Sequence, residues 1–179
     1  MDTSEMVRLG KPCFYLASLT DDQFANLQLQ LIHILRSGVV RVIRGSRSRT
    51  LSSFFDEASA ALQFPYYFGR NWNAFSECIA DLEWAPGDAY VVMLAQAHLL
   101  LSDADEDFRI LLRILDEANT EWLTPNQYYP RNRHPTPFHV VLQSPIGDAS
   151  TFGRSDLELL QLLDSASVEF GHLEQPYTF

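Results

Sequence analysis

The chain has 179 residues, of which 46% are hydrophobic and 20% are charged, so its composition is that of a globular protein large enough to bury a core. Its formal net charge of −10 argues against general binding to nucleic acid or membrane surfaces and favours a basic partner, although acidity alone also keeps a protein soluble. A length of 179 residues predicts a single domain. The protein is predicted to be cytoplasmic, because its two cysteines are isolated and the sequence contains no secretory leader pattern and no apolar run of membrane-spanning length.

The first part of the sequence predicts two strands separated by a capped helix. Residues 13–18 are a candidate strand. Thr20 and Gln23 fit a capping box, and apolar residues then recur at helical spacing. Gly38 is the expected end of that helix, and residues 39–44 are rich in β-branched side chains, which favour a strand.

Arginines gather around this second strand with no acidic residue among them. The cluster consists of Arg36, Arg41, Arg44, Arg47 and Arg49. RNA binding is one interpretation of such a cluster, but the aromatic and lysine side chains that usually accompany it are missing. A solvated strand edge and loop is the favoured interpretation.

The densest local pattern runs from Phe64 to Leu82. Thr50 can cap a helix that runs to about Gln63 and that Pro65 ends. Gly69 permits a sharp turn, and the side-chain oxygen of Asn71 can cap the next helix. Apolar residues from Trp72 onward recur at helical spacing and form one face of that helix. Its other face is polar and partly acidic, and consists of Asn73, Ser76, Glu77, Ala80 and Asp81.

The second half of the sequence predicts two more strands around a long helix. Residues 89–94 form a continuous apolar run, which is typical of a strand covered on both faces. We expect a short helical piece at residues 97–101 and a long helix that begins at Ser102 or Asp103. Four prolines between residues 122 and 137 predict a loop. Residues 138–143 are the last predicted strand.

This order of elements predicts an α/β fold, because helices between apolar strands favour a mainly parallel sheet with helical cover. Three strands fall within residues 39–144, which we expect to form the central domain. Residues 1–38 would extend it with a strand and a helix. Residues 145–179 would add a helical extension that opens with a capping box at Ser155, packed on the same domain.

Catalytic chemistry is not indicated by the sequence. It has no glycine-rich phosphate loop or paired-cysteine metal site, and its histidines are scattered. Cys78 has no basic group nearby in the sequence, which favours a buried structural thiol over a nucleophile. Glu77 and Asp81 are spaced by one helical turn and suit the attraction of cations better than acid–base catalysis. We therefore predict no catalytic residue, metal site or cofactor.

The segment Pro-Tyr-Tyr-Phe-Gly-Arg-Asn-Trp-Asn-Ala-Phe-Ser-Glu-Cys-Ile at residues 65–79 resembles the signature of the barstar family, small intracellular inhibitors of secreted ribonucleases. The resemblance extends over residues 39–143, just over half of the chain. It implies a three-stranded parallel sheet packed against helices, which the strand at residues 13–18 would extend to four. It also implies that the loop and helix of this segment occupy the active site of a ribonuclease.

In the barstar family an acidic side chain at the position of Glu77 takes the place of a substrate phosphate among the enzyme's basic residues, and the late part of the long helix adds further acidic groups. The surface implied to contact the partner, taken with the polar face of the helix, consists of Tyr67, Phe68, Gly69, Asn71, Trp72, Asn73, Ser76, Glu77, Ala80, Asp81, Glu117 and Glu121. The partner would be a basic secreted ribonuclease or ribonuclease-type toxin, with the chain acting as its bacterial immunity protein.

Three positions depart from the family pattern. Asn73 stands where an aspartate is common, Ser76 replaces a bulky aromatic residue, and Glu77 is longer by a methylene than the aspartate of the best-known member. These departures favour a different ribonuclease, or another basic toxin, as the partner. The alternative is a scaffold or interaction protein of barstar fold that no longer binds a ribonuclease.

Overall fold

The computed structural model of the chain describes residues 6, 8–10, 13–125, 134–144 and 170–172. The helix predicted at Ser155, most of the proline-rich loop and most of the C-terminal extension lie outside these residues. The described strands are β1 (Phe14–Ser18), β2 (Val39–Arg44), β3 (Tyr90–Ala95), β4 (Phe138–Ser144) and β5 (Phe170–His172).

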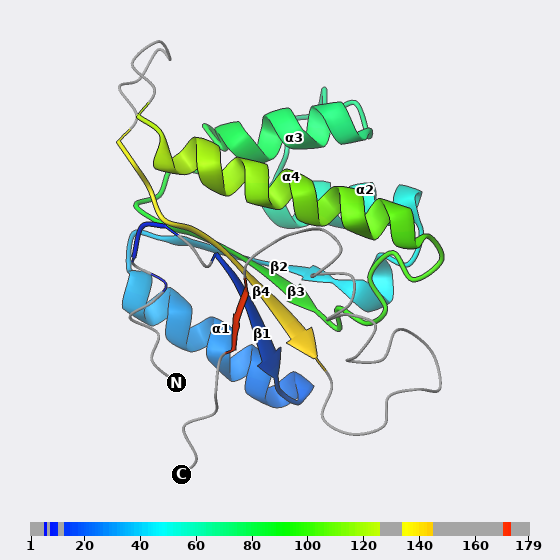
Figure 1. Ribbon diagram of the computed structural model, residues 1–179, viewed down its shortest axis with the longest axis horizontal. Coiled ribbons are helices and arrows are strands. Elements are labelled where there is room, and N and C mark those ends of the chain that lie inside the picture. The colour runs from blue at the N-terminus through cyan, green and yellow to red at the C-terminus, as the bar shows by residue number, and fades with distance from the viewer. Residues whose placement is uncertain (1–5, 7, 11–12, 126–133, 145–169, 173–179) are drawn as a thin grey trace.

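All five strands form one parallel sheet in the order β2-β3-β4-β1-β5, as Figure 1 shows in part. The predicted α/β fold with a parallel sheet is confirmed. The strand predicted at residues 13–18 also joins this sheet, because Phe14 of β1 lies opposite Val140 of β4. The sheet is therefore wider than three strands, and β2 forms one of its edges.

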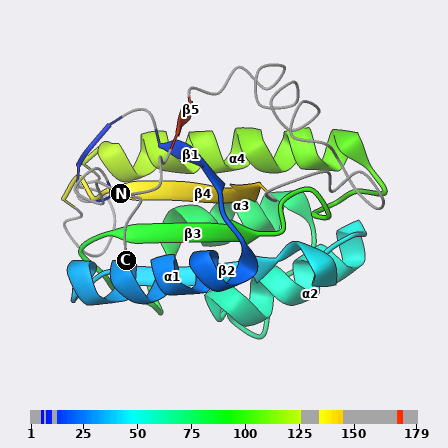
Figure 2. The ribbon, with the colours of Figure 1, turned by 90° about the horizontal axis from the view of Figure 1, so that it is seen from below.

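Helices cover both faces of the sheet. Helix α1 (Asp21–Leu35) lies on one face, and α2 (Leu51–Leu62), α3 (Trp72–Asp81) and α4 (Asp105–Leu123) lie on the other (Figures 1 and 2). Seen from the side of α1, this helix lies over β2 and β3 at the edge of the sheet (Figure 2). None of the helices in the described part of the chain is both long enough and apolar enough to cross a membrane.

Side chains alternate between the two faces of each strand, so the sheet contributes to two cores. Val92 and Leu94 of β3 face a large core shared with α2, α3 and α4. Val91 and Met93 of the same strand face a smaller core beneath α1. The buried residues of α1 that close this smaller core are Phe24, Leu27, Leu31 and Leu35.

Helices α1 and α2 begin at the capping residues that the sequence predicts. The Gln23 amide donates to the Thr20 hydroxyl over 3.3 Å, and the Thr20 amide donates to the Gln23 side chain over 3.0 Å, which completes the predicted capping box. Thr50 caps α2 in a similar way with Ser53. Both helices therefore begin where the sequence indicates.

The segment between β3 and α4 differs from the prediction. Residues 97–101 form successive hydrogen-bonded turns instead of a short helix, and Leu101 adopts a left-handed φ of 51°. The amide of Leu101 donates to the Ser48 carbonyl over 2.8 Å, so tertiary contacts satisfy a backbone group that a helix would have paired internally. Helix α4 consequently begins at Asp105, with no side-chain cap, and not at Ser102 or Asp103.

The C-terminal end of α4 also corrects the prediction. Residues 122 and 123 were expected in the proline-rich loop, but they form the last turn of α4, and Trp122 is buried. Pro125 disfavours helical backbone at the residue before it, Thr124, which is extended, so the helix can continue to Leu123. The Trp122 indole donates to the Ile79 carbonyl over 3.0 Å and thereby joins α4 to α3.

Candidate partner-binding site

The segment before α3 is a tight turn that projects two tyrosines. The Phe68 amide donates to the Pro65 carbonyl over 2.9 Å, which places Tyr66 and Tyr67 at the tip of the turn. Tyr66 is fully exposed and Tyr67 is 70% exposed, with their rings edge to face at 5.7 Å. Tyr67 was predicted at the partner surface, whereas Tyr66 was not. The signal for Tyr66 was its place after a proline in a turn, where side chains face solvent.

Aromatic side chains that face inward hold this turn in place. The ring of Phe68 lies 4.9 Å from that of Phe64 and 5.9 Å from that of Phe55. Trp72 lies 5.1 Å from Phe55 and 5.9 Å from Phe75. Phe68 and Trp72 are therefore half-buried packing residues as well as predicted contact residues.

Asn71 caps α3 as predicted. Its side-chain oxygen accepts a hydrogen bond from the Ala74 amide at 2.9 Å, and its side-chain nitrogen donates to the Gly69 carbonyl at 3.1 Å. A Cβ atom on Gly69 would lie only 3.0 Å from that nitrogen, so a larger residue would crowd the cap. The left-handed residue of the turn is Arg70, with a φ of 50°, so Gly69 is needed for the close approach of its neighbour.

Arg70 ties the turn to α2. Its guanidinium forms an ion pair with Asp56 and lies within 3.5 Å of the Ser52 carbonyl. The hydrogen bond raises the pKa of Arg70 and lowers the pKa of the Asp56 carboxyl. This contact could not be predicted from the sequence, because the two residues are fourteen positions apart and have no motif in common.

Helix α3 buries one face and exposes the other. Phe75, Cys78 and Ile79 are buried, whereas Asn73 and Glu77 are exposed. The remaining predicted residues of the polar face, Ser76, Ala80 and Asp81, are half-buried. The structure thus places Asn73 and Glu77 at the solvent surface directly after the exposed turn.

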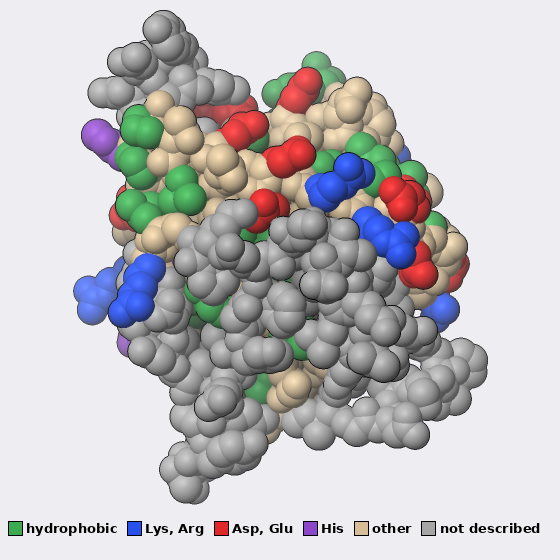
Figure 3. Space-filling model, viewed as in Figure 1, with side chains coloured by type: hydrophobic (Ala, Val, Ile, Leu, Met, Phe, Trp, Pro, Cys, Tyr) green, Lys and Arg blue, Asp and Glu red, His purple; other side chains and the backbone are tan. Residues whose placement is uncertain are grey.

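Helices α3 and α4 pack side by side and run in the same direction (Figure 1). The Trp72 indole at the start of α3 donates to Asp107 near the start of α4 over 3.1 Å, and Trp122 near the end of α4 donates to Ile79 near the end of α3. Glu117 and Glu121 are exposed on the second half of α4. In Figure 3 acidic side chains gather over α3 and the adjoining part of α4.

The chemistry of this surface suits recognition of positive charge. Burial, with a smaller effect of the carboxylates of Asp81 and Glu77, raises the pKa of the Cys78 thiol, which keeps it protonated and unreactive. Among the described residues no group of three or more His, Cys, Asp or Glu side chains could hold a metal ion. What the surface offers is carboxylates, an amide and a phenol, all of which can bind a cationic partner.

Comparison with protein-family models finds the family described as barstar (barnase inhibitor), which matches residues 39–143, more than half of the chain. No curated protein matches the sequence.

Among solved structures, a chain of the Drosophila ORC bound to GC-rich DNA and Cdc6 is similar at 14% identity and a TM-score of 0.45, over 89% of this chain and 24% of that chain. A second structure, of Drosophila ORC bound to poly(dA/dT) DNA and Cdc6, is similar at 14% identity and a TM-score of 0.46, over 95% of this chain and 26% of that chain. The chain thus spans about a quarter of the length of those chains, and a likeness of this extent indicates no shared function.

Proposed function

The chain belongs to the barstar family, and on that premise we propose that it is an inhibitor that binds a basic ribonuclease, or a ribonuclease-type toxin, and covers its active site. In this proposal α3 and the turn before it enter the active site of the enzyme. The carboxylate of Glu77 takes the place of a substrate phosphate, and Glu117 and Glu121 attract basic residues around the site.

The observation that carries the proposal is the exposure of Glu77 on α3, the helix that follows the tyrosine turn and packs against α4, where Glu117 and Glu121 are also exposed. A carboxylate that becomes buried among cations with hydrogen bonds to each oxygen can dominate the affinity of an interface. Because Asn71, Gly69 and Arg70 fix the turn before binding, little conformational entropy is lost on association.

The first prediction concerns Glu77→Gln, which keeps the size of the side chain and removes its charge. We expect the complex with the ribonuclease to weaken by about 2 kcal/mol or more, roughly thirtyfold in Kd, because the cations of the enzyme would lose their buried partner. The measurement is inhibition of RNA cleavage by purified barnase and by other basic bacterial ribonucleases, titrated with the chain and with each variant. Stoichiometric loss of cleavage is the result expected for the natural partner.

The matched control is Asp22→Asn, which removes one exposed carboxylate from α1 on the opposite face of the sheet. This variant should inhibit as well as the unchanged chain. If Glu77→Gln and Asn71→Ala left inhibition unchanged, α3 would not be the contact surface. If no basic ribonuclease were inhibited at stoichiometric concentrations, the non-inhibitory scaffold would replace this proposal.

A further inference from the structure

Strand β2 leaves one side of the sheet open within the described residues. It is the terminal strand in the sheet order and, among the described strands, pairs only with β3. On its outer side the Arg41 guanidinium donates to the Val40 carbonyl over 3.1 Å, and the Arg44 amide donates to Glu57 over 3.4 Å, so a docking strand would displace these two side-chain contacts. The outer backbone N–H and C=O groups of an edge strand can pair with a strand from another chain. The residues of β2 are not among those of the proposed inhibitor surface, which lie on α3, on the turn before it and on α4.

Helix α1 carries apolar side chains that its own packing does not use. Beyond its buried stripe, Ala25 is exposed, Leu29 is 64% exposed and Ile32 is 47% exposed. At about 100° per residue, Leu29 and Ile32 lie roughly 60° apart, so they share one flank of the helix. A solvated helix flank is usually polar, so this flank is suited to contact with another apolar surface.

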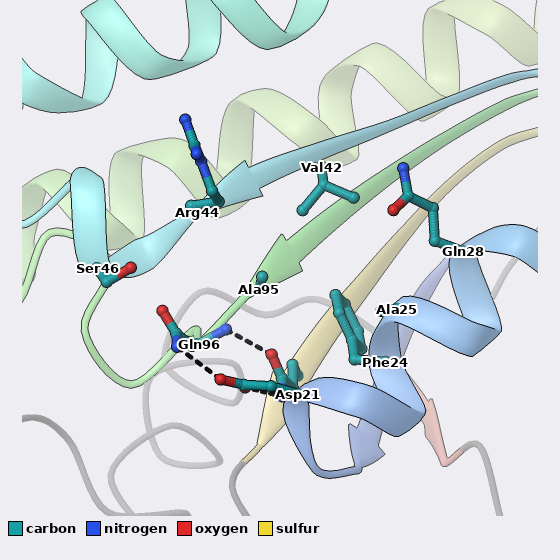
Figure 4. Close-up of a pocket in the computed structure, with 10 residues that line it drawn as sticks. Asp21, Phe24, Ala25, Gln28, Val42, Arg44, Ser46, Ala95 and Gln96 are labelled. Carbon is teal, nitrogen blue, oxygen red and sulfur yellow. Dashed lines mark hydrogen bonds between the residues drawn. The ribbon is translucent and has the colours of Figure 1, made fainter.

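The same part of α1 forms a hollow with the edge of the sheet. The hollow has a volume of about 250 Å³ and lies between Phe24, Ala25 and Gln28 of α1 and Val42 of β2 (Figure 4). One end is closed by the Gln96 side chain, which donates to Asp21 over 3.0 Å. A strand added beside β2 would direct alternate side chains toward α1, into this hollow and against its apolar flank.

Arg41 lies on the opposite face of the same edge. Because side chains alternate along a strand, Arg41 lies on the same face of β2 as Ile43. Val40 lies on the other face, in the core beneath α1. Within the described residues the Arg41 guanidinium donates to the carbonyl of Val40 over 3.1 Å and forms no ion pair with a carboxylate. Arg44 lines the hollow, but its guanidinium points away from it (Figure 4), and its Nε donates to Glu57 over 2.6 Å.

We infer that the β2 edge is a docking site for an extended segment of a protein partner in which apolar residues alternate with aspartate or glutamate. The segment pairs with the backbone of β2, its apolar side chains cover the flank of α1, and its carboxylates meet Arg41. A second copy of the chain fits this edge poorly, since pairing β2 with β2 would bring arginines together. Nucleic acid lacks the alternating apolar groups that the flank of α1 requires.

The test uses fluorescein-labelled peptides and fluorescence anisotropy with the full chain. The probe is a peptide of about eight residues with alternating valine and glutamate, matched to the usual length of a strand. Three comparison probes are the same residues arranged in two blocks, an alternating valine and lysine peptide, and a single-stranded RNA of about the same length. Binding of the valine–glutamate peptide in preference to all three is expected.

The first variant reverses the charge of Arg41 and tests the proposed charge pair directly. Arg41→Glu should weaken the valine–glutamate peptide roughly tenfold and strengthen the valine–lysine peptide, since an attractive cross-strand charge pair becomes repulsive. Arg113→Glu, which makes the same change at an exposed position of α4, is the matched control and should alter neither affinity.

Removal of the apolar flank is the second variant. The double variant Leu29→Gln and Ile32→Gln should also weaken the valine–glutamate peptide several-fold, because each exposed side chain would be buried on binding. Ile34→Gln is the control: Ile34 is 44% exposed but lies about 160° from Ile32 around the helix. Since all three residues are exposed, the variants are expected to fold.

Three outcomes would overturn the inference. The block peptide or the lysine peptide could bind as tightly as the alternating acidic one. RNA could bind more tightly than every peptide and lose affinity with Arg41→Glu. Sedimentation velocity could reveal a dimer of the chain that the Leu29→Gln and Ile32→Gln changes abolish, in which case a second copy occupies the edge.

Discussion

Asn71 uses both ends of its side-chain amide to join the tyrosine turn to α3. Asn71→Ala would leave the Ala74 amide and the Gly69 carbonyl without these partners. We expect the free energy of unfolding to fall by about 1 kcal/mol, as for the loss of other helix caps. Urea unfolding followed by far-UV circular dichroism measures this change.

The control for this change is Asn73→Ala, two residues further along. Asn73 is exposed on α3, and alanine is the better helix former by up to about 0.7 kcal/mol, so stability should stay the same or rise slightly. Equal losses of stability in the two variants would mean that the cap contributes nothing specific.

Residue-level predictions succeeded where the chemistry is local. Thr20, Thr50 and Asn71 each bond to a backbone group three residues away, so the sequence alone contains both partners. Trp72 differs, because its bond to Asp107 joins residues that are distant in the sequence. Its role in packing α3 against α4 could not be read from helical spacing, and its contact with a partner stays a prediction.

At the level of elements, β2 and α2 are joined by an ion pair between Arg44 and Glu57. Two nitrogens of the guanidinium donate to the two carboxylate oxygens, over 2.6 and 3.0 Å. This hydrogen bonding lowers the pKa of the Glu57 carboxyl below its ordinary value of 4.5. A lowered pKa in the folded state stabilises the protein above the unfolded-state pKa, and the stabilisation is lost as pH falls through the folded-state value.

Glu57→Gln should therefore reduce stability at neutral pH and make little difference in acid. Because 59% of the Arg44 side chain is exposed and solvent screens the pair, we expect a loss of only about 0.5–1 kcal/mol at about pH 7. Urea unfolding of both proteins at about pH 7 and at about pH 3 should show the difference shrink toward zero at the lower pH.

Asp56→Asn is the matched control on the same helix. Asp56 pairs with Arg70, but both side chains are more than half exposed, so its removal should affect stability less than Glu57→Gln does. A difference between wild type and Glu57→Gln that stayed constant from neutral to acidic pH would show that the pair contributes through packing instead of charge.

Boundaries of elements were the weaker part of the sequence prediction, and α4 shows the reason at both ends. Its start lies at Asp105 because Ala104 is extended, with φ −155° and ψ 91°, and because the residues before it bond to a distant loop. The amides of Leu101 and Asp103 donate to the Ser48 and Arg49 carbonyls of that loop. Its end extends to Leu123 because burial of Trp122 against Tyr90, with ring centres 4.5 Å apart, stabilises one more turn. Both effects come from residues far away in the sequence, which a local pattern does not contain.

At the scale of the molecule, the parallel arrangement of β1 to β4 could be predicted because each of these strands is apolar and separated from the next by helix. The order of strands could not, since β1 could have been placed at either edge. The structure places it between β4 and β5, where its buried residues Phe14 and Tyr15 face the two different cores. The predicted boundaries at residues 38 and 144 stay a prediction, although β1 and α1 pack within the same sheet and cores.

Charge is distributed unevenly over this molecule, and that distribution gives the last prediction. Carboxylates gather over α3 and the second half of α4, while the arginine cluster lies around β2. If the acidic side meets a basic ribonuclease, attraction should begin before contact and speed association. The association rate should fall roughly tenfold between about 0.01 and 0.15 M salt, as the Debye length shrinks from about 30 to 8 Å, with little change in dissociation.

Stopped-flow fluorescence with the inhibited ribonuclease measures both rates. The double variant Glu117→Gln and Glu121→Gln should associate more slowly at low salt and show a weaker salt dependence, because the lost charges lie beside α3. The double variant Asp22→Asn and Asp88→Asn changes the net charge equally at exposed positions outside α3 and α4, and should keep most of the salt dependence. Equal loss in both variants would assign the attraction to net charge alone and remove Glu117 and Glu121 from the contact surface.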